Sequence, residues 1–130
     1  MLSFSNFGSS RHESSDRVRL AVEIIRSRCP ELLVDGEMQA DTAVVPERIE
    51  QTYPFSPLRG GANVLIFPSL DAGNIVYKLL ASMGGAQLIG PILMGLARPV
   101  HVLQRDSSVS DVVNLAALAA VEAQENLRST

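Results

Sequence analysis

Short apolar runs alternate with polar or glycine-rich segments along the chain, and this alternation predicts most of its elements. The run ANVLIFP, residues 62–68, lies between two glycines and a final proline, which predicts a strand buried on both faces of a parallel sheet. Shorter runs predict three further strands at residues 2–5, 31–37 and 100–103. The apolar stretch 86–99 is broken by glycine and proline, and it predicts a strand or a loop over the sheet edge.

Apolar residues at helical spacing predict helices between these strands. The first is expected to begin at a cap on Ser14 or Ser15 and to stop at Pro30, with Val18 and Val22 on its apolar face. Residues 70–83 predict a second helix, and the alanine- and leucine-rich segment from Ser110 or Asp111 onward predicts the strongest one. Residues 38–53 show a weaker helical pattern that Pro46 interrupts, and residues 54–61 predict a loop. Four alternations of strand and helix indicate an α/β fold with a largely parallel sheet.

Composition narrows the class of protein. The chain has 130 residues, 46% hydrophobic and only 19% charged, so either much of it is buried or some apolar surface belongs to a partner or to further chain. A net charge of −3 gives no general attraction to nucleic acid. One cysteine, Cys29, excludes an internal disulfide framework and fits a reducing cytosol. No apolar run is long enough for a membrane span, and the first residues lack the pattern of a secretory signal.

Two loops are candidates for binding an anion. In NFGSS, residues 6–10, Gly8 frees the backbone so that amides and hydroxyls can surround an anion, although a flexible polar loop is the better interpretation. In QRDSSVSD, residues 104–111, Arg105 can bind phosphate beside a helix amino terminus. Ser108 and Asp111 in the same segment have the spacing of a capping box, which is purely structural.

Other polar residues give weaker indications. Asp71 and Asn74 follow the strand 62–68 at its carboxyl end, where ligands bind in open α/β sheets, but capping of a helix is the preferred role of Asp71. His12 and His101 stand apart from each other and from the single cysteine, so no metal site is predicted. His101 is expected to be a packed or edge-strand side chain and not a base.

Five blocks, in their order and spacing, resemble the phosphate acetyltransferase/butyryltransferase family over nearly the whole chain. They are LSFSNFGSS, PELLVDGEMQADTAVV, GGANVLIFPSLDAGNIVYKLL, IGPILMGLARPVHVL and SSVSDVVNLAALAAVEAQ. The resemblance covers the carboxyl-terminal part of the family's domain. It implies a three-layer α/β/α fold with a mostly parallel sheet, of the isocitrate/isopropylmalate dehydrogenase-like kind, of which residues 1–130 are the C-terminal portion, excised from a longer polypeptide.

The family has a transferase branch and a branch that forms the C-terminal domain of NADP-dependent malic enzymes. SNFGSS, DGEMQAD and LMGLARPVHVL look like the malic-enzyme branch, whereas true transferases tend to have Ser-Thr-Lys-Gly-Ser at the first block and Pro-(Val/Ile)-Asn-Asp-Leu-Ser-Arg at the last. The transferase's Ser-Arg pair falls on Gln104 and Arg105, and its aspartate, proposed to assist thiol deprotonation, falls on Asp111. A further family arginine falls on Ser82.

The resemblance therefore implies an acetyl-CoA-binding regulatory domain without catalysis of its own, in a cytoplasmic malic enzyme that converts malate to pyruvate. The alternative is a working phosphate acetyltransferase with Arg105 and Asp111 as its catalytic residues. NADP and a divalent metal would belong to the malic-enzyme part outside this chain, and a dimer or higher homo-oligomer is expected, with no nucleic acid or membrane partner. The ligand-binding residues implied are Ser9, Ser10, Asn74, Gly90, Pro91, Gln104, Arg105 and Asp111.

Overall fold

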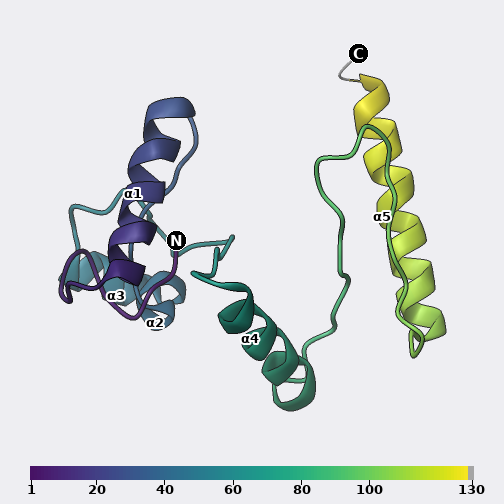
Figure 1. Cartoon of the computed structure of the whole chain (residues 1–130), viewed down its shortest axis with the longest axis horizontal. Helices are drawn as coiled ribbons and strands as arrows, with labels where there is room; N and C mark the ends of the chain where they lie inside the picture. The colour runs from purple at the N-terminus through teal and green to yellow at the C-terminus, as the bar shows by residue number, and fades with distance from the viewer. Residues whose placement is uncertain (129–130) are drawn as a thin grey trace. The chain divides into compact units, whose positions relative to one another are not determined.

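The computed structural model describes residues 1–128, and the chain divides into two compact units, residues 1–77 and 78–130. Its helices, in chain order, are α1 (Glu13–Arg28), α2 (Ala40–Val44), α3 (Pro46–Thr52), α4 (Leu70–Met83) and α5 (Val109–Arg128) (Figure 1). The helices expected at 70–83 and at the end of the chain are confirmed. α5 begins one residue earlier than the expected start at Ser110.

Helix α1 begins two or three residues earlier than the sequence indicates, because His12 and not Ser14 or Ser15 is its N-cap. The Nδ1 atom of His12 accepts the Ser14 N–H at 3.2 Å, and the His12 N–H donates to the Ser15 hydroxyl at 3.2 Å. An imidazole nitrogen therefore replaces the usual hydroxyl acceptor, and Ser15 supplies the reciprocal bond of a capping box. The helix ends at Arg28, two residues before Pro30, as expected.

Residues 40–52 form two short helices instead of one. α2 ends at Val44, and α3 begins at Pro46, which occupies its first turn. Proline suits this position because its missing N–H would have no partner inside the helix and its φ is already helical. The predicted interruption at Pro46 is confirmed, and residues 53–61 form the expected loop.

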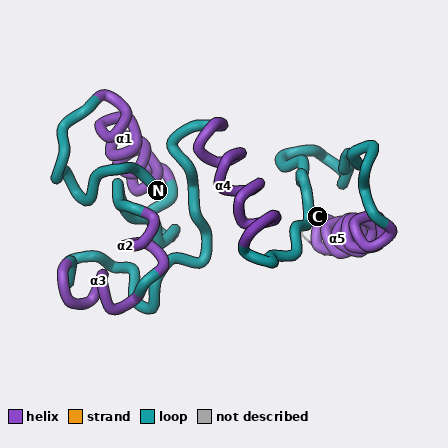
Figure 2. The backbone as a smooth tube through the Cα atoms, turned by 90° about the horizontal axis from the view of Figure 1, so that it is seen from below, coloured by secondary structure: helices purple, strands orange, loops and turns teal. Residues whose placement is uncertain are grey.

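The four predicted strands are not present as strands in residues 1–128, and Figure 2 draws the backbone between the helices as loops. An isolated parallel bridge joins Leu2 to Met38. The Ser3 N–H donates to the Met38 carbonyl at 2.8 Å, and the Leu2 N–H donates to the Ile66 carbonyl at 2.8 Å. Two of the four predicted segments, 2–5 and 62–68, thus lie in contact, and the first also pairs with Met38, one residue beyond the predicted strand 31–37. The successive hydrogen bonds are too few to make a ladder.

The expectation that residues 62–68 are buried on both faces is also wrong for this structure. Leu65 and Phe67 pack against the core, whereas Val64 is 67% exposed and Ile66 is 48% exposed. Successive side chains of an extended segment point to opposite faces, so the core covers one face and leaves the other open. A continuous apolar run indicates which segments need burial but does not say what buries them.

The core of the first unit forms where these extended segments meet α2, α3 and the loop after α3. Its buried members are Leu2, Met38, Ala43, Ile49 and Leu58. Gly36 lies beside this core with φ +131°, and a Cβ there would come within 2.5 Å of the Met1 carbonyl oxygen. Only glycine fits such a close approach of two backbones.

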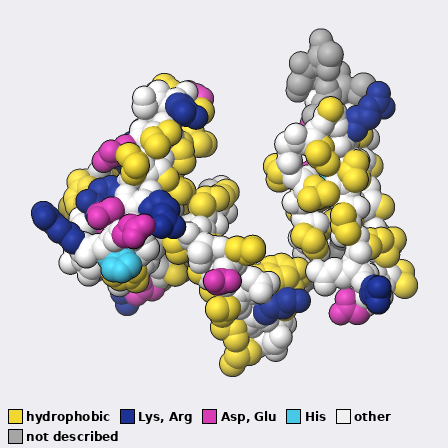
Figure 3. All heavy atoms as spheres, in the orientation of Figure 1, with side chains coloured by type: hydrophobic (Ala, Val, Ile, Leu, Met, Phe, Trp, Pro, Cys, Tyr) yellow, Lys and Arg dark blue, Asp and Glu magenta, His cyan; other side chains and the backbone are white. Residues whose placement is uncertain are grey.

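In the second unit, apolar side chains lie largely at the surface of the helices (Figure 3). In α5, Leu115 is buried at 5% exposure, while Val113 is 60% and Val121 is 51% exposed. Helix α4, which spans the boundary between the two units, has no buried residue, and Met83 at its end is 82% exposed. The high apolar content could reflect either a largely buried chain or apolar surface that a partner or further chain covers. The structure supports the second explanation, because these apolar side chains are exposed. No helix in residues 1–128 is long and apolar enough to cross a lipid bilayer.

The core predicts a large effect of truncating Ile49, which is fully buried. Ile49→Ala removes three carbon atoms from a site that has no access to water, so it should lower the free energy of unfolding of the first unit by about 2 to 5 kcal/mol. The matched control is Ile24→Ala, because Ile24 is 43% exposed and should cost much less. Urea unfolding of both variants measures the difference, and equal losses would contradict this core.

Candidate functional site

The loop of residues 5–10 contains the first predicted anion site, and its backbone donors are already occupied. The Phe7 N–H donates to the Glu37 carbonyl at 2.8 Å, and the Gly8 N–H donates to the Glu37 carboxylate at 2.6 Å. The other amides of the loop also donate within the chain: Ser5 to Ser3 Oγ, Asn6 to Ser9 Oγ, Ser9 to the Asn6 carbonyl and Ser10 to Ser5 Oγ. The loop is therefore an ordered structure closed on itself and not the flexible segment that the sequence favours.

The centre of this arrangement is Glu37, whose side chain is completely buried. Its Oε1 atom accepts the Gly8 N–H and, at 2.9 Å, the Ser5 hydroxyl, while Oε2 accepts the Arg19 Nε–H at 3.2 Å. Burial alone raises the pKa of this carboxyl, but the hydrogen bonds to the ionised form lower it more, and the net pKa lies below the ordinary 4.5. The predicted anion cradle thus exists, and its anion is part of the chain.

Ser9 and Ser10 are exposed at the outer side of the same loop. The Ser9 hydroxyl accepts the Asn6 N–H at 3.0 Å and lies 3.3 Å from the Ser5 hydroxyl. The Ser10 hydroxyl has no partner among residues 1–128. Both hydroxyls can therefore meet a ligand, although no observation assigns one, and their role stays a prediction.

Asn74 is also in the first unit, in the second turn of α4, and its side chain is exposed without a hydrogen bond in the described part of the chain. The cap of α4 is Ser69, whose hydroxyl accepts the Ala72 N–H at 3.2 Å. The expectation that Asp71 caps this helix is therefore wrong, since Asp71 lies inside the first turn, where its negative charge still favours the helix dipole. No hydrogen bond joins Asn74 to the loop of Ser9 and Ser10 within residues 1–128.

The second predicted anion site lies in the second unit, in the turn before α5. The Ser107 N–H donates to the Gln104 carbonyl at 3.2 Å, and the Gln104 N–H donates to the Ser107 hydroxyl at 3.0 Å, so the turn closes around Arg105. The Arg105 side chain is exposed and has no ion pair or hydrogen bond in the part that the structure describes. Its guanidinium remains free for a phosphate.

Asp111 and Ser108 form the capping box that their spacing predicts. The Ser108 N–H donates to Asp111 Oδ2 at 2.7 Å, and the Asp111 N–H donates to the Ser108 hydroxyl at 3.2 Å. Hydrogen bonds from the backbone and the hydroxyl of Ser108 hold the pKa of Asp111 below its usual 3.8. A carboxylate with a lowered pKa is a weak general base, and this one also serves as a helix cap.

Gly90 and Pro91, the remaining predicted ligand residues, lie in the loop between α4 and α5 and are joined by a cis peptide bond. Pro91 is exposed and Gly90 is partly covered. The stretch 86–99 is thus the loop that one of the two sequence interpretations proposed. The structure places no group of the turn 104–111 in hydrogen-bond contact with Gly90 or Pro91 among the described residues.

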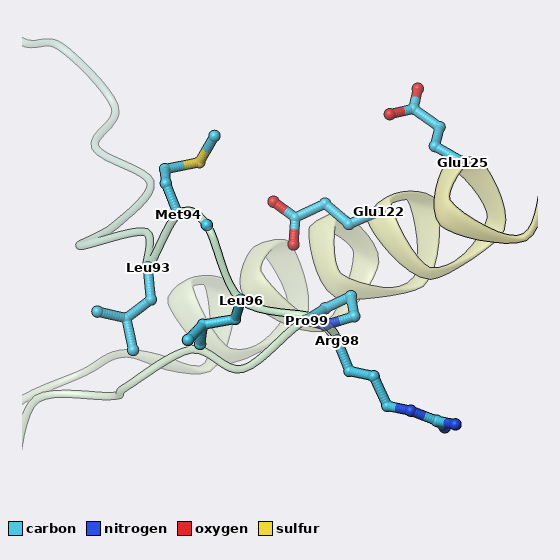
Figure 4. A pocket seen from close by; sticks show the side chains of 8 residues that line it. Leu93, Met94, Leu96, Arg98, Pro99, Glu122 and Glu125 are labelled. Carbon is cyan, nitrogen blue, oxygen red and sulfur yellow. The ribbon is translucent and has the colours of Figure 1, made fainter. Parts of the chain in front are cut away.

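His101 has the packed environment expected from the sequence. Its side chain is only 5% exposed, and its Nε2 lies 3.0 Å from Glu122 Oε2 of α5, while the buried Nδ1 has no partner in residues 1–128. Glu122 also lines a cavity of about 260 Å³ together with Glu125 and Arg98, and in Figure 4 the Arg98 side chain extends away from both carboxylates. None of the predicted ligand residues lines this cavity.

The first unit contains a second hollow, an apolar cleft of about 340 Å³. Its walls include Leu33, Leu58 and Val64, and its one charged lining side chain, that of Asp35, accepts the Ser56 hydroxyl at 2.6 Å. Neither Ser9 nor Ser10 lines it. The described residues contain no group of three or more histidine, cysteine, aspartate or glutamate side chains that could hold a metal ion.

Sequence reasoning missed Glu37, the group that orders the first loop. The available signal was its position in DGEMQAD, where two carboxylates flank a glycine directly before the apolar Met38. Because charges are rarely buried without a partner, a carboxylate in such a segment indicates a fixed set of donors nearby. Which residues supply those donors depends on contacts across 29 and 18 positions of the chain, to Gly8 and Arg19.

Comparisons with known proteins agree over almost the whole chain. A profile of the family described as phosphate acetyl/butaryl transferase matches residues 1–120. A phosphate acetyltransferase of Acetivibrio thermocellus is 48% identical over 95% of this chain and 37% of its own length. An NADP-dependent malic enzyme of Escherichia coli is 49% identical over 95% of this chain and 16% of its own length.

Among solved structures, the EutD phosphotransacetylase from Staphylococcus aureus matches with a TM-score of 0.88 and 42% identity, over 95% of this chain and 38% of that one. The chain thus spans well under half the length of these relatives. Transferases and malic enzymes match it almost equally well, so overall identity does not separate the two branches.

The lowered pKa of Glu37 predicts that acid opens the loop of residues 5–10. The folded carboxyl has the lower pKa, so its stabilisation is complete above the unfolded value of about 4.5 and is lost as the pH falls toward the folded value. Within that window, hydrogen exchange of the loop amides, corrected for the intrinsic effect of pH, should rise by up to about tenfold per pH unit. Mass spectrometry of peptides from residues 1–12 measures this, and an unchanged exchange rate down to pH 3 would contradict it.

Proposed function

The chain belongs to the phosphate acetyl/butaryl transferase family, and we propose that it is the acetyl-CoA-binding, regulatory part of an NADP-dependent malic enzyme. The observation that carries the proposal is the pair Gln104 and Arg105. The arginine that can hold a phosphate is present and free, while the serine hydroxyl that precedes it in true transferases is replaced by a longer amide side chain.

A second substitution supports binding without turnover. Transfer of an acetyl group passes through an anionic tetrahedral centre, and one well-placed donor is typically worth about 3 to 4 kcal/mol at such a centre. Ser82 replaces an arginine of the family pattern, so a positive charge is lost in addition to the hydroxyl at position 104. If both contributions to stabilising the transition state are lost, the transfer rate is expected to fall by several powers of ten.

Binding is affected less by these losses. A free guanidinium at Arg105, the exposed hydroxyls of Ser9 and Ser10 and apolar surface are the groups that an acyl-CoA needs, and all of them are present. Asn74, Gly90, Pro91 and Asp111 complete the proposed set of ligand residues. The weak basicity of Asp111, whose pKa is lowered by Ser108, also favours holding a thioester over deprotonating a thiol.

Residues 1–130 are proposed to be the C-terminal portion of a phosphotransacetylase-like domain in a longer polypeptide. The exposed faces at Val64 and Ile66 and along α5 then meet the rest of the domain, and the segments near residues 2, 38 and 66 become strands of a three-layer α/β/α fold with a mostly parallel sheet. The apolar surface that remains suits association into a dimer or higher homo-oligomer.

The parent polypeptide would oxidatively decarboxylate malate to pyruvate in the cytoplasm. NADP and a divalent metal would be held by the malic-enzyme part outside this chain. The present chain would then supply the acyl-CoA site, and binding at that site would control the malate reaction.

The alternative is a working phosphate acetyltransferase. It is favoured by the 48% identity to the Acetivibrio enzyme and by the presence of both Arg105 and Asp111. In that case Arg105 holds the phosphate side of the reaction and Asp111 accepts the thiol proton. The two functions differ in which reaction acetyl-CoA changes.

The regulatory proposal predicts that acetyl-CoA alters malate oxidation by the intact polypeptide that carries this chain. NADPH formation is followed while acetyl-CoA is titrated, and calorimetry measures the binding itself. Arg105→Ala should weaken binding by about ten- to a hundredfold, since a charged hydrogen bond is worth about 1.5 to 3 kcal/mol, and should shift the regulatory response to higher acetyl-CoA. Arg59→Ala is the matched control, because that arginine is exposed and lies in a different loop. No detectable uptake of acetyl-CoA would refute the proposal.

The same proposal predicts a very low transferase rate. Formation of acetyl-CoA from acetyl phosphate should be slower by at least about three powers of ten than in a dedicated phosphate acetyltransferase assayed alongside. Gln104→Ser combined with Ser82→Arg restores both family groups and should raise the rate, whereas either change alone should do less. A wild-type rate comparable to that of the dedicated enzyme would establish the alternative instead.

A further inference from the structure

The loop of residues 5–10 surrounds a buried carboxylate, and this changes which part of a ligand the loop can touch. In the described structure every N–H from Ser5 to Ser10 donates to an acceptor of the chain itself. An external phosphate would find no free amide there. Residues 5–10 carry no positive charge of their own, and the Arg19 guanidinium is already paired with Glu37 and Asp16.

The groups that remain accessible are uncharged. They are the hydroxyls of Ser9 and Ser10, both on exposed residues at the outer side of the loop. Hydroxyls can donate to a carbonyl or accept from an amide N–H. In acyl-CoA these partners are found in the amide-containing pantetheine arm, while the charge is concentrated in the phosphorylated nucleotide half.

The loop conformation also depends on being held. Phe7 has φ +47°, a left-handed conformation that is unfavourable for a residue with a side chain. It persists because the Phe7 N–H donates to the Glu37 carbonyl and the Phe7 ring contacts Tyr53 and Phe55, with ring centroids 4.9 Å away in both cases. Backbone strain of this kind is common at functional sites, where the surrounding structure fixes an otherwise unstable geometry.

We propose that Glu37 is a positioning residue, which fills the anion site of this loop and so makes Ser9 and Ser10 contact the uncharged pantetheine arm of acyl-CoA. The inference rests on the proposed acetyl-CoA site and adds which half of the ligand the first loop recognises. Glu37 does not touch the ligand. It acts through the Gly8 amide and the Ser5 hydroxyl on one oxygen and through Arg19 on the other.

The decisive variant is Glu37→Gln in the intact polypeptide. A carboxylate accepts hydrogen bonds at both oxygens, whereas a glutamine has one accepting oxygen and an NH₂ group that must face another donor, either Arg19 or the pair Gly8 and Ser5. The loop then loses one set of its bonds. Glu31→Gln is the matched control, because Glu31 lies in the same segment, carries the same charge and is exposed.

Three ligands are measured by competition against labelled acetyl-CoA: acetyl-CoA itself, acetyl-pantetheine and the phosphorylated nucleotide half of coenzyme A. Glu37→Gln should weaken acetyl-CoA and acetyl-pantetheine by about tenfold and leave the nucleotide half within about twofold, while Glu31→Gln changes none of them. Ser9→Ala with Ser10→Ala keeps the hydrogen bonds to Glu37 but removes the one from the Asn6 N–H to Ser9 Oγ, and it should reproduce the same selective loss. Ser10→Ala alone removes no side-chain hydrogen bond of the described residues and should show part of that loss.

The outcomes distinguish failure of the proposed acetyl-CoA site from failure of the contact between the first loop and the pantetheine arm. If the wild type does not bind acetyl-CoA, the proposed function fails. If the wild type binds acetyl-CoA but acetyl-pantetheine does not compete, the assignment of the loop to the arm is overturned. An equal loss of both halves in Glu37→Gln, or no loss in the double serine variant, would likewise overturn it, because it would reduce Glu37 to a residue needed only for folding.

Discussion

The carboxylate of Glu37 is buried at zero exposure between the first loop and α1, and an ionised group in that position is stable only with a full set of donors. Those donors come from Gly8, Ser5 and Arg19. The requirement therefore ties three separate parts of the first unit together: the loop of residues 5–10, helix α1 and the segment that follows Gly36. The strained backbone at Phe7 and the orientation of the serine hydroxyls both depend on this one constraint.

A second constraint comes from apolar groups that the described residues leave uncovered. The segment 62–68 partly buries Leu65 and Phe67 but exposes Val64 and Ile66. Helix α5 buries Leu115, while Val109, Val112, Val113 and Val121 stay at the surface. Exposed apolar surface of this extent is unfavourable in water. It agrees with the proposal that further polypeptide covers this surface, since the chain spans 16% to 38% of the length of the relatives described above.

The two predicted anion sites differ in their chemistry. In the first loop the anion is internal, so the accessible groups are neutral hydroxyls. In the turn before α5 the carboxylate of Asp111 is engaged by Ser108, and the exposed guanidinium of Arg105 is left as the free charge. The accessible groups of the first loop are thus neutral, whereas the turn before α5 presents a positive charge. Both arrangements serve binding better than acid–base chemistry.

The sequence by itself determined the features that depend on neighbours along the chain. Residues 70–83 and the C-terminal helix follow from helical periodicity, the division at Pro46 follows from the missing N–H of proline, and the capping box of Ser108 and Asp111 follows from a spacing of three. Family membership was also visible, in the order of five blocks. The tertiary structure alone decided that His12 caps α1, that Ser69 and not Asp71 caps α4, and that the predicted strands make only one bridge. It alone placed Glu37 inside the first loop, because a buried charge selects its donors by proximity in space, and that proximity joins residues whose separation in sequence carries no pattern.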